Sequence, residues 1–99
     1  LRNGRHSIPG QVYLVTFVTY GRRRHFSEWA PAARAAALLS SPATWPKTQL
    51  LAWVLMPDHW HGLVQLDEHS LSTAVGYCKG RTSRLLRGQS AEPGRLWAT

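Results

Sequence analysis

Hydrophobic and polar residues follow patterns along this chain that predict three strands and a helix between the first two. The segment 11–20, QVYLVTFVTY, is rich in Val, Thr and aromatic residues, a composition that favours a strand. The similar segments 49–56 and 59–66 are separated only by a Pro-Asp pair, which predicts a hairpin with a tight turn. Between the first and second strands, the Ala- and Leu-rich segment 31–39 predicts a helix whose first turn holds its proline.

A second helix is predicted after the hairpin, beginning at Ser70 or Ser72, either of which can cap it, and ending near Arg87. The other segments are predicted to be a polar arm, a proline-containing loop, a break and the start of a further element, at residues 1–10, 41–48, 88–94 and 96–97. The order strand, helix, strand, strand, helix makes up the first five parts of a split βαβ, or ferredoxin-like, sandwich. We therefore predict an α+β fold in which an antiparallel sheet carries both helices on one face.

Two histidines stand two residues apart in the third predicted strand. Because side chains alternate between the two faces of a strand, His59 and His61 are expected to point the same way and Trp60 the opposite way, into the core. Two neutral imidazoles on one face provide half of a divalent-metal site, to which octahedral Mg²⁺ or Mn²⁺ would add a third protein ligand, water and phosphate oxygens. Asp58 is expected to make the turn or to hold the tautomer of a neighbouring histidine. The histidines interpreted as bystanders in loops or caps are His6, His25 and His69.

The amino-acid composition indicates which class of partner the chain binds and in which cellular compartment it is expected. The 99 residues suffice for one compact domain, and a hydrophobic content of 43% is compatible with a real core. The formal charge of +7 favours an anionic partner, nucleic acid before membrane, since no basic amphipathic helix with a large apolar face is evident. The single cysteine, Cys78, excludes an internal disulfide and a Cys-based zinc site and fits a reducing cytosol, so a cytoplasmic protein is expected. The sequence contains no run of about 18 apolar residues, so no membrane-spanning helix is expected.

Basic residues form two groups that could position nucleic acid through its phosphates. The residues are Arg22, Arg23 and Arg24, directly after the first strand, and Lys79, Arg81 and Arg84, in the second helix. Under the alternative interpretation, the arginine triplet is a solvated loop, and the helical group complements the helix dipole near its C-terminal end. Both interpretations remain open from the sequence alone.

Aromatic residues offer further candidates for chemistry on nucleic acid. Tryptophan side chains can stack on bases, although they more often belong to a core. The tryptophans considered for stacking are Trp29, Trp45, Trp53 and Trp97. Tyr77, in the second helix, is a candidate nucleophile because a polarised phenolate can attack a phosphodiester, but its spacing does not require this role.

Several of these segments together resemble the HUH single-tyrosine transposases, in particular the REP-associated tyrosine transposases. The resemblance rests on MPDHWHGLV at 56–64, YLVTFVT at 13–19, GRRRHF at 21–26, GYCKGRTS at 76–83 and GRLW at 94–97. The family commonly has Asn at the position of Asp58. The likeness covers nearly the whole chain in the right order, and the ordered set is much more specific than the histidine motif alone.

The resemblance implies a concrete reaction. Family members cleave and rejoin single-stranded DNA, often near a hairpin, through a tyrosine that attacks the phosphodiester and leaves a 5′-phosphotyrosine and a free 3′-OH. Carried over to this chain, His59 and His61 would be ligands of Mg²⁺ or Mn²⁺, which polarises the scissile phosphate. The nucleophilic tyrosine of the family lies on a later helix, beyond the region of Trp97, near an Asn, Gln or His that supplies the third ligand. Tyr77 matches a non-catalytic position on the preceding helix.

Residues 1–99 are therefore expected to form one HUH transposase-like domain that is truncated at its C-terminus, either as a piece of a longer protein or as an inactive relative. Such a domain would lack the nucleophile, the third metal ligand, the catalytic helix and the last strand of the sheet. A missing strand exposes a sheet edge that another chain can cover, so homodimerisation is a further expectation left open.

Two rival functions remain open at this point. The first is a non-catalytic, ferredoxin-like module that binds nucleic acid on the same sheet face, with salt-sensitive affinity and no dependence on metal. The second is a fragment of a zinc hydrolase, in which the run from Asp58 to His61 supplies metal ligands, although further histidines at useful spacing are missing. Addition of a chelator would discriminate the first rival from the transposase hypothesis.

Overall fold

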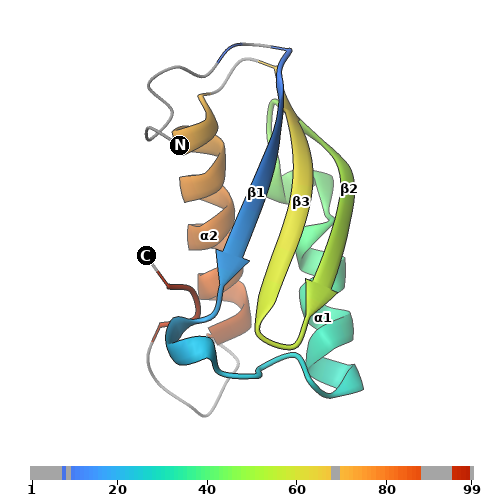
Figure 1. Cartoon of the computed structure of the whole chain (residues 1–99), viewed down its shortest axis with the longest axis vertical. Helices are drawn as coiled ribbons and strands as arrows, with labels where there is room; N and C mark the ends of the chain where they lie inside the picture. Colours follow the sequence, from blue (N-terminus) through green and yellow to red (C-terminus); the bar gives the residue numbers. More distant parts are fainter. Residues whose placement is uncertain (1–7, 9, 68–69, 88–94, 99) are drawn as a thin grey trace.

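The computed structural model describes residues 8, 10–67, 70–87 and 95–98, within which three antiparallel strands form one sheet and two helices cover one of its faces (Figure 1). The elements are β1 (Val12–Val18), the 3-10 helix η1 (Tyr20–Arg22), α1 (Trp29–Leu39), the 3-10 helix η2 (Pro42–Thr44), β2 (Thr48–Met56), β3 (His59–Leu66) and α2 (Leu71–Arg87). The strand order is β1-β3-β2, so that β3 is the central strand of this sheet. The predicted α+β fold, with an antiparallel sheet and helices on one face, is confirmed.

The helix-covered face of the sheet holds an aromatic core. Phe17 of β1 and Trp60 of β3 are buried on this face, and Trp45, which follows η2, stacks against both. The ring centroids lie 5.1 Å apart for Phe17 and Trp60 and 5.7 Å apart for Trp45 and Trp60. Trp60 is fully buried, as the alternation along the third strand predicts. This packing fixes the orientation of β3, and therefore of the side chains on its opposite face.

The starts of both helices follow from local backbone chemistry. α1 begins at Trp29, two residues before the predicted start at Pro31. Pro31 therefore lies in the first turn of the helix, where an N–H group has no helical partner and a proline is tolerated. At the start of α2, the Ser70 hydroxyl oxygen accepts a hydrogen bond of 3.1 Å from the N–H of Thr73. Of the two predicted caps, the helix therefore uses Ser70, and Ser72 lies within α2.

The last described residues lie against the outer edge of β1. Thr19 and Trp97 form an isolated antiparallel bridge, and the N–H of Ala98 donates to the carbonyl oxygen of Val18 at 2.7 Å. Leu96 and Trp97 are buried. The further element predicted at 96–97 is therefore present as a single bridge beside β1, at the edge where a fourth strand would extend the sheet.

Some of the sequence predictions fall outside the described residues. These are residues 1–7 and 9 of the arm, residues 88–94 of the predicted break, and the histidines His6 and His69. No helix in the described part of the chain is long and apolar enough to cross a membrane.

Cys78 is expected to resist alkylation while the protein is folded. The side chain is fully buried on α2, and this burial raises the pKa of its thiol to about 12, despite the neighbouring charge of Lys79. Because the thiolate is the reactive form and an exposed thiol has a pKa of about 8.5, alkylation at neutral to mildly alkaline pH should be at least about tenfold slower in the native than in the unfolded chain. Mass spectrometry after timed exposure to iodoacetamide, with and without guanidinium chloride, measures this ratio.

The pH dependence of the alkylation rate provides the control. The rate of the unfolded chain should rise with pH through about 8.5, and the native rate should rise in parallel but stay lower, because it equals the rate of the exposed thiol multiplied by the fraction of molecules that open. Equal native and unfolded rates would show that Cys78 is accessible and that α2 does not pack against the sheet as described.

Candidate metal site

His59 and His61, the histidine pair, lie side by side on the face of the sheet that the helices leave open. Trp60 between them is buried toward the helices, so the two histidines alternate to the other face. The antiparallel register places Val18 of β1 opposite His59 and Thr16 of β1 opposite His61. The two rings therefore share one face, as their spacing in the sequence predicts.

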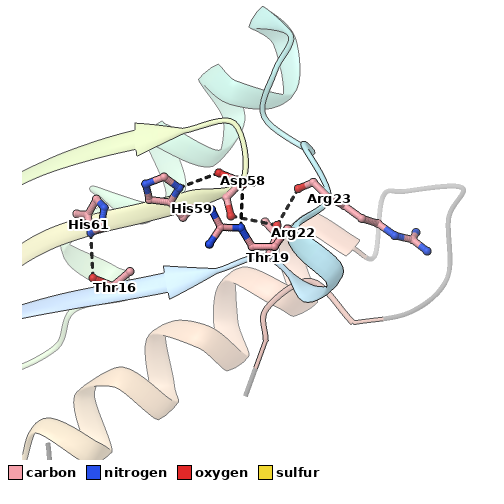
Figure 2. A network of polar contacts seen from close by, with 7 residues as sticks. All are labelled: Thr16, Thr19, Arg22, Arg23, Asp58, His59 and His61. Atoms are coloured by element: carbon pink, nitrogen blue, oxygen red, sulfur yellow. Dashed lines mark hydrogen bonds and ion pairs between the residues drawn. The ribbon is translucent and has the colours of Figure 1, made fainter.

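Each ring of the histidine pair is held through its Nδ1 atom (Figure 2). The Nδ1–H of His59 donates to Oδ1 of Asp58 at 2.7 Å, and Nδ1 of His61 is hydrogen bonded to the Thr16 hydroxyl at 2.9 Å. Because a carboxylate only accepts hydrogen bonds, the contact with Asp58 fixes the proton of His59 on Nδ1. The tautomer-holding role predicted for Asp58 is consistent with this contact. Both rings keep Nε2, the nitrogen not used in these contacts, for a metal ion.

The spacing of the two rings fits a single metal ion. Their centroids are 4.6 Å apart, and their planes are inclined by 75°. Two imidazoles that bind one ion through Nε2 at a right angle have centroids about 4.5 Å apart when the metal–nitrogen distance is about 2.1 Å. No group of three or more His, Cys, Asp and Glu side chains gathers among the described residues, so a third ligand of these types does not come from them.

Asp58 joins the histidine pair to the segment that follows β1. Its Oδ2 accepts a hydrogen bond of 3.0 Å from Nε of Arg22, while its Oδ1 accepts the bond from His59. The hydrogen bond from His59 lowers the pKa of Asp58 most, and the charge of Arg22 adds to this effect against the opposing effect of desolvation. The carboxyl group therefore remains ionised, and an acceptor for His59, below its ordinary pKa.

Thr19 fixes the distance between the two turns that carry Arg22 and Asp58. This threonine is fully buried, and both its N–H and its hydroxyl donate to the carbonyl oxygen of Asp58 at 3.0 Å. The hydroxyl also lies 2.7 Å from the carbonyl oxygen of Arg23, so that its single proton is shared between the two carbonyl oxygens. A buried side chain with its polar atoms paired holds both turns in one arrangement.

The residues predicted to bind DNA lie on two different sides of the molecule. Arg22, Arg23 and Arg24 follow β1 beside the turn of Asp58, and all three are exposed. Lys79, Arg81 and Arg84 belong to α2, on the helix-covered side of the sheet (Figure 1). The two groups therefore do not form a single surface, because only the arginine group lies next to the histidine pair, and the contacts of both groups with DNA stay a prediction.

Two of the cations on α2 make internal contacts. Nζ of Lys79 donates to the carbonyl oxygen of Ala98 at 2.8 Å, and burial lowers the pKa of this lysine. Nε of Arg81 donates to the hydroxyl oxygen of Thr44 at 3.2 Å. Both side chains therefore hold neighbouring segments against α2, a role that the pattern of charges along the helix did not reveal.

The structure also shows which of the aromatic residues considered for chemistry or base stacking are accessible. Tyr77 lies on α2, across the sheet from the histidine pair, so the two are not brought together. Trp45 and Trp97 are only 3% and 4% exposed and belong to the core, where they cannot stack on bases. Trp29 and Trp53 are 84% and 41% exposed and remain available for such contacts.

Sequence reasoning missed Thr16 and Thr19 as parts of the site. Thr16 contacts His61 across 45 positions of the chain, and Thr19 contacts Asp58 across 39. The signal that could have found them is the order of strands in a ferredoxin-like sheet, which places 11–20 beside 59–66. That order does not give the register, and the contacts depend on the register.

Exposed apolar side chains also lie on the open face beside the histidine pair. Leu14 of β1 is 67% exposed, and Val54 of β2 and Leu63 of β3 are 47% and 40% exposed. These side chains help to line a shallow hollow of about 260 Å³ that reaches His61. Apolar side chains that gather in this way on an exposed surface are typical of a binding surface.

Comparisons with known proteins identify the family of the chain and its fold. The sequence profile of the family described as "Transposase IS200 like" matches residues 8–99. The crystal structure of a presumed transposase from Deinococcus radiodurans has the same fold, with a TM-score of 0.76 and 24% sequence identity over 98% of this chain and 79% of that chain. No curated protein matches the chain significantly. The profile match spans nearly the whole sequence, and the chain therefore belongs to the family of IS200-like transposases.

Proposed function

We propose that this chain binds single-stranded or hairpin DNA and takes part in its cleavage and rejoining, with Mg²⁺ or Mn²⁺ held by the histidine pair. The observation that carries the proposal is the arrangement of His59 and His61, whose rings lie 4.6 Å apart with both Nδ1 atoms held by neighbouring side chains. Membership of a transposase family supports DNA as the substrate. The net charge of +7 supports an anionic partner as well.

In this proposal, each residue near the pair has a separate task. His59 and His61 hold the ion through Nε2, and Asp58 and Thr16 keep the two rings in position. When bound, the ion supplies Lewis-acid polarisation of the scissile phosphate. The exposed apolar hollow next to His61 suits unpaired bases better than a duplex, whose outer surface is made of phosphates.

The proposal assigns the nucleophile to a residue other than Tyr77. A 5′-phosphotyrosine can form only if the phenol oxygen reaches the phosphate on the histidine face, and α2 lies on the other side of the sheet. We infer that the described residues supply DNA and metal binding and that Tyr77 does not supply the nucleophile. The Tyr77→Phe variant should therefore bind DNA and metal as the unchanged protein does.

A hairpin oligonucleotide with a single-stranded flank tests the proposed function. The affinity of the unchanged protein, measured by fluorescence anisotropy, should fall by about tenfold when Mn²⁺ is replaced by EDTA, because the bridge between the histidine pair and a phosphate is lost. Zn²⁺ in place of Mn²⁺ tests the zinc hydrolase alternative. Intact-mass analysis of the same mixtures reports whether any covalent adduct forms.

The outcomes separate the candidate functions. Binding that depends on Mn²⁺ supports the proposal. Salt-sensitive binding with equal affinity in Mn²⁺ and EDTA would contradict it and favour the non-catalytic binding module. A covalent adduct that disappears in Tyr77→Phe would overturn the assignment of the nucleophile.

A further inference from the structure

We propose that Arg22 is a phosphate-binding residue of the site formed by the histidine pair, and that Asp58 holds it in place for this task. The inference rests on the proposed function, because the phosphate in question is that of DNA bound beside the metal ion. It assigns different roles to arginines that are adjacent in the sequence: Arg22 contacts the phosphate at the site, whereas Arg23 does not.

The backbone after β1 is shaped to direct the side chain of Arg22. Gly21 and Arg22 both have left-handed backbone conformations, with φ of 68° and 57°. For a residue with a Cβ atom this conformation is unfavourable, because the Cβ atom crowds the carbonyl oxygen. The N–H of Arg22 donates to the carbonyl oxygen of Thr19 at 3.0 Å, which closes the turn. The turn is therefore held in an unfavourable conformation by buried contacts on either side.

The result of this conformation is visible in the directions of two neighbouring side chains (Figure 2). The guanidinium of Arg22 turns back toward Asp58 and His59, whereas that of Arg23 points away from the network. Nε of Arg22 donates to Oδ2 of Asp58 at 3.0 Å, and Oδ1 of the same carboxylate accepts from His59. Arg22 is therefore connected to a proposed metal ligand through one carboxylate.

The ion pair leaves most of the arginine accessible. The side chain of Arg22 is 64% exposed, against 17% for Asp58. A guanidinium has five N–H donors, and the contact with Asp58 uses the one on Nε. The forked end, which matches the oxygens of a phosphate, is then presented on the side of the molecule where His59 lies.

The ion pair with Asp58 does not by itself explain this arrangement. An ion pair with such an exposed partner contributes little to stability and does not outweigh the cost of the left-handed conformation of Arg22. Backbone strain that is retained without a gain in stability is characteristic of functional sites. A phosphodiester bound at the histidine pair carries a negative charge next to the arginine, and this charge supplies the missing interaction.

Three variants test the proposal: Arg22→Gln, Arg22→Lys and, as a matched control that removes the same charge, Arg23→Gln. Affinity for the hairpin oligonucleotide is measured in Mn²⁺ and in EDTA, and affinity for Mn²⁺ is measured without DNA. In Mn²⁺, Arg22→Gln should weaken DNA binding by about tenfold, and Arg22→Lys should recover only part of the loss because it lacks the fork. Arg23→Gln should weaken binding less than about threefold, and equally in EDTA.

The Mn²⁺ affinity without DNA distinguishes phosphate binding from an indirect effect through Asp58. Arg22→Gln should leave this affinity unchanged within about threefold. Equal losses for Arg22→Gln and Arg23→Gln would overturn the inference, and so would a loss of Mn²⁺ affinity that accounts for the whole loss of DNA affinity. If the unchanged protein binds DNA equally in Mn²⁺ and EDTA, the proposed function itself fails. Thermal unfolding of each variant confirms that the fold is retained.

Discussion

Replacing Gly62 with alanine is expected to lower the free energy of unfolding by about 3 kcal/mol, at the upper end of the usual cost of overpacking a core. An added Cβ would overlap three carbons of the Trp60 indole, the farthest of which would be 2.8 Å away. Trp60 is fully buried against Phe17 and Trp45, so its ring cannot move without displacing theirs. Urea denaturation followed by tryptophan fluorescence measures the change.

Gly76 offers a matched control for this substitution. It lies in α2, and a Cβ added there would meet nothing within 4 Å. Alanine is more favourable than glycine inside a helix by up to about 1 kcal/mol, so Gly76→Ala should leave the stability unchanged or increase it. If both variants were equally stable, the close packing of Trp60 over Gly62 would be wrong, and with it the reason why β3 has a fixed orientation.

The second large effect is expected at the histidine pair. Replacing both His59 and His61 with alanine should weaken Mn²⁺ binding by at least about 100-fold, because loss of the ligands themselves should exceed the 10- to 100-fold loss typical of their hydrogen-bonding partners. Both side chains lie on the open face of the sheet, outside the core, so the variant should remain folded. Isothermal titration with MnCl₂ measures the affinity, and circular dichroism checks the fold.

His25 is the appropriate control for this experiment. It lies in a different place, in a cleft formed with Phe26, Pro31 and Leu86 on the helical side of the molecule. The His25→Ala variant should therefore keep the Mn²⁺ affinity of the unchanged protein. A loss of affinity as large as that of the double variant would mean that the ion binds elsewhere or that binding is a nonspecific effect of histidine content.

Local periodicity predicted the parts of the site that lie close together in the sequence. The orientations of His59, Trp60 and His61 follow from strand alternation alone, because that pattern depends only on the backbone of β3. The hairpin of β2 and β3, to which these residues belong, follows from the Pro-Asp turn between two apolar segments. The order of the elements then predicted the sheet with helices on one face, since only a few arrangements connect such elements.

Contacts between distant segments could not be predicted in the same way. Thr16 and His61 meet because β1 and β3 pair in one particular register, which the composition of the strands does not determine. Arg22 and Arg23 are indistinguishable in the sequence, and their different directions depend on a positive φ at Arg22. The internal contact of Lys79 likewise depends on where residues 95–98 lie against α2.

His59 and His61 are proposed to hold a divalent metal ion together. Pulsed electron paramagnetic resonance of Mn²⁺ bound to protein labelled with ¹⁵N-histidine tests this claim directly. We expect magnetic couplings from two imidazole nitrogens, which should disappear when His59 and His61 are both replaced by alanine. A spectrum without nitrogen couplings, or one that the double substitution leaves unchanged, would contradict this claim.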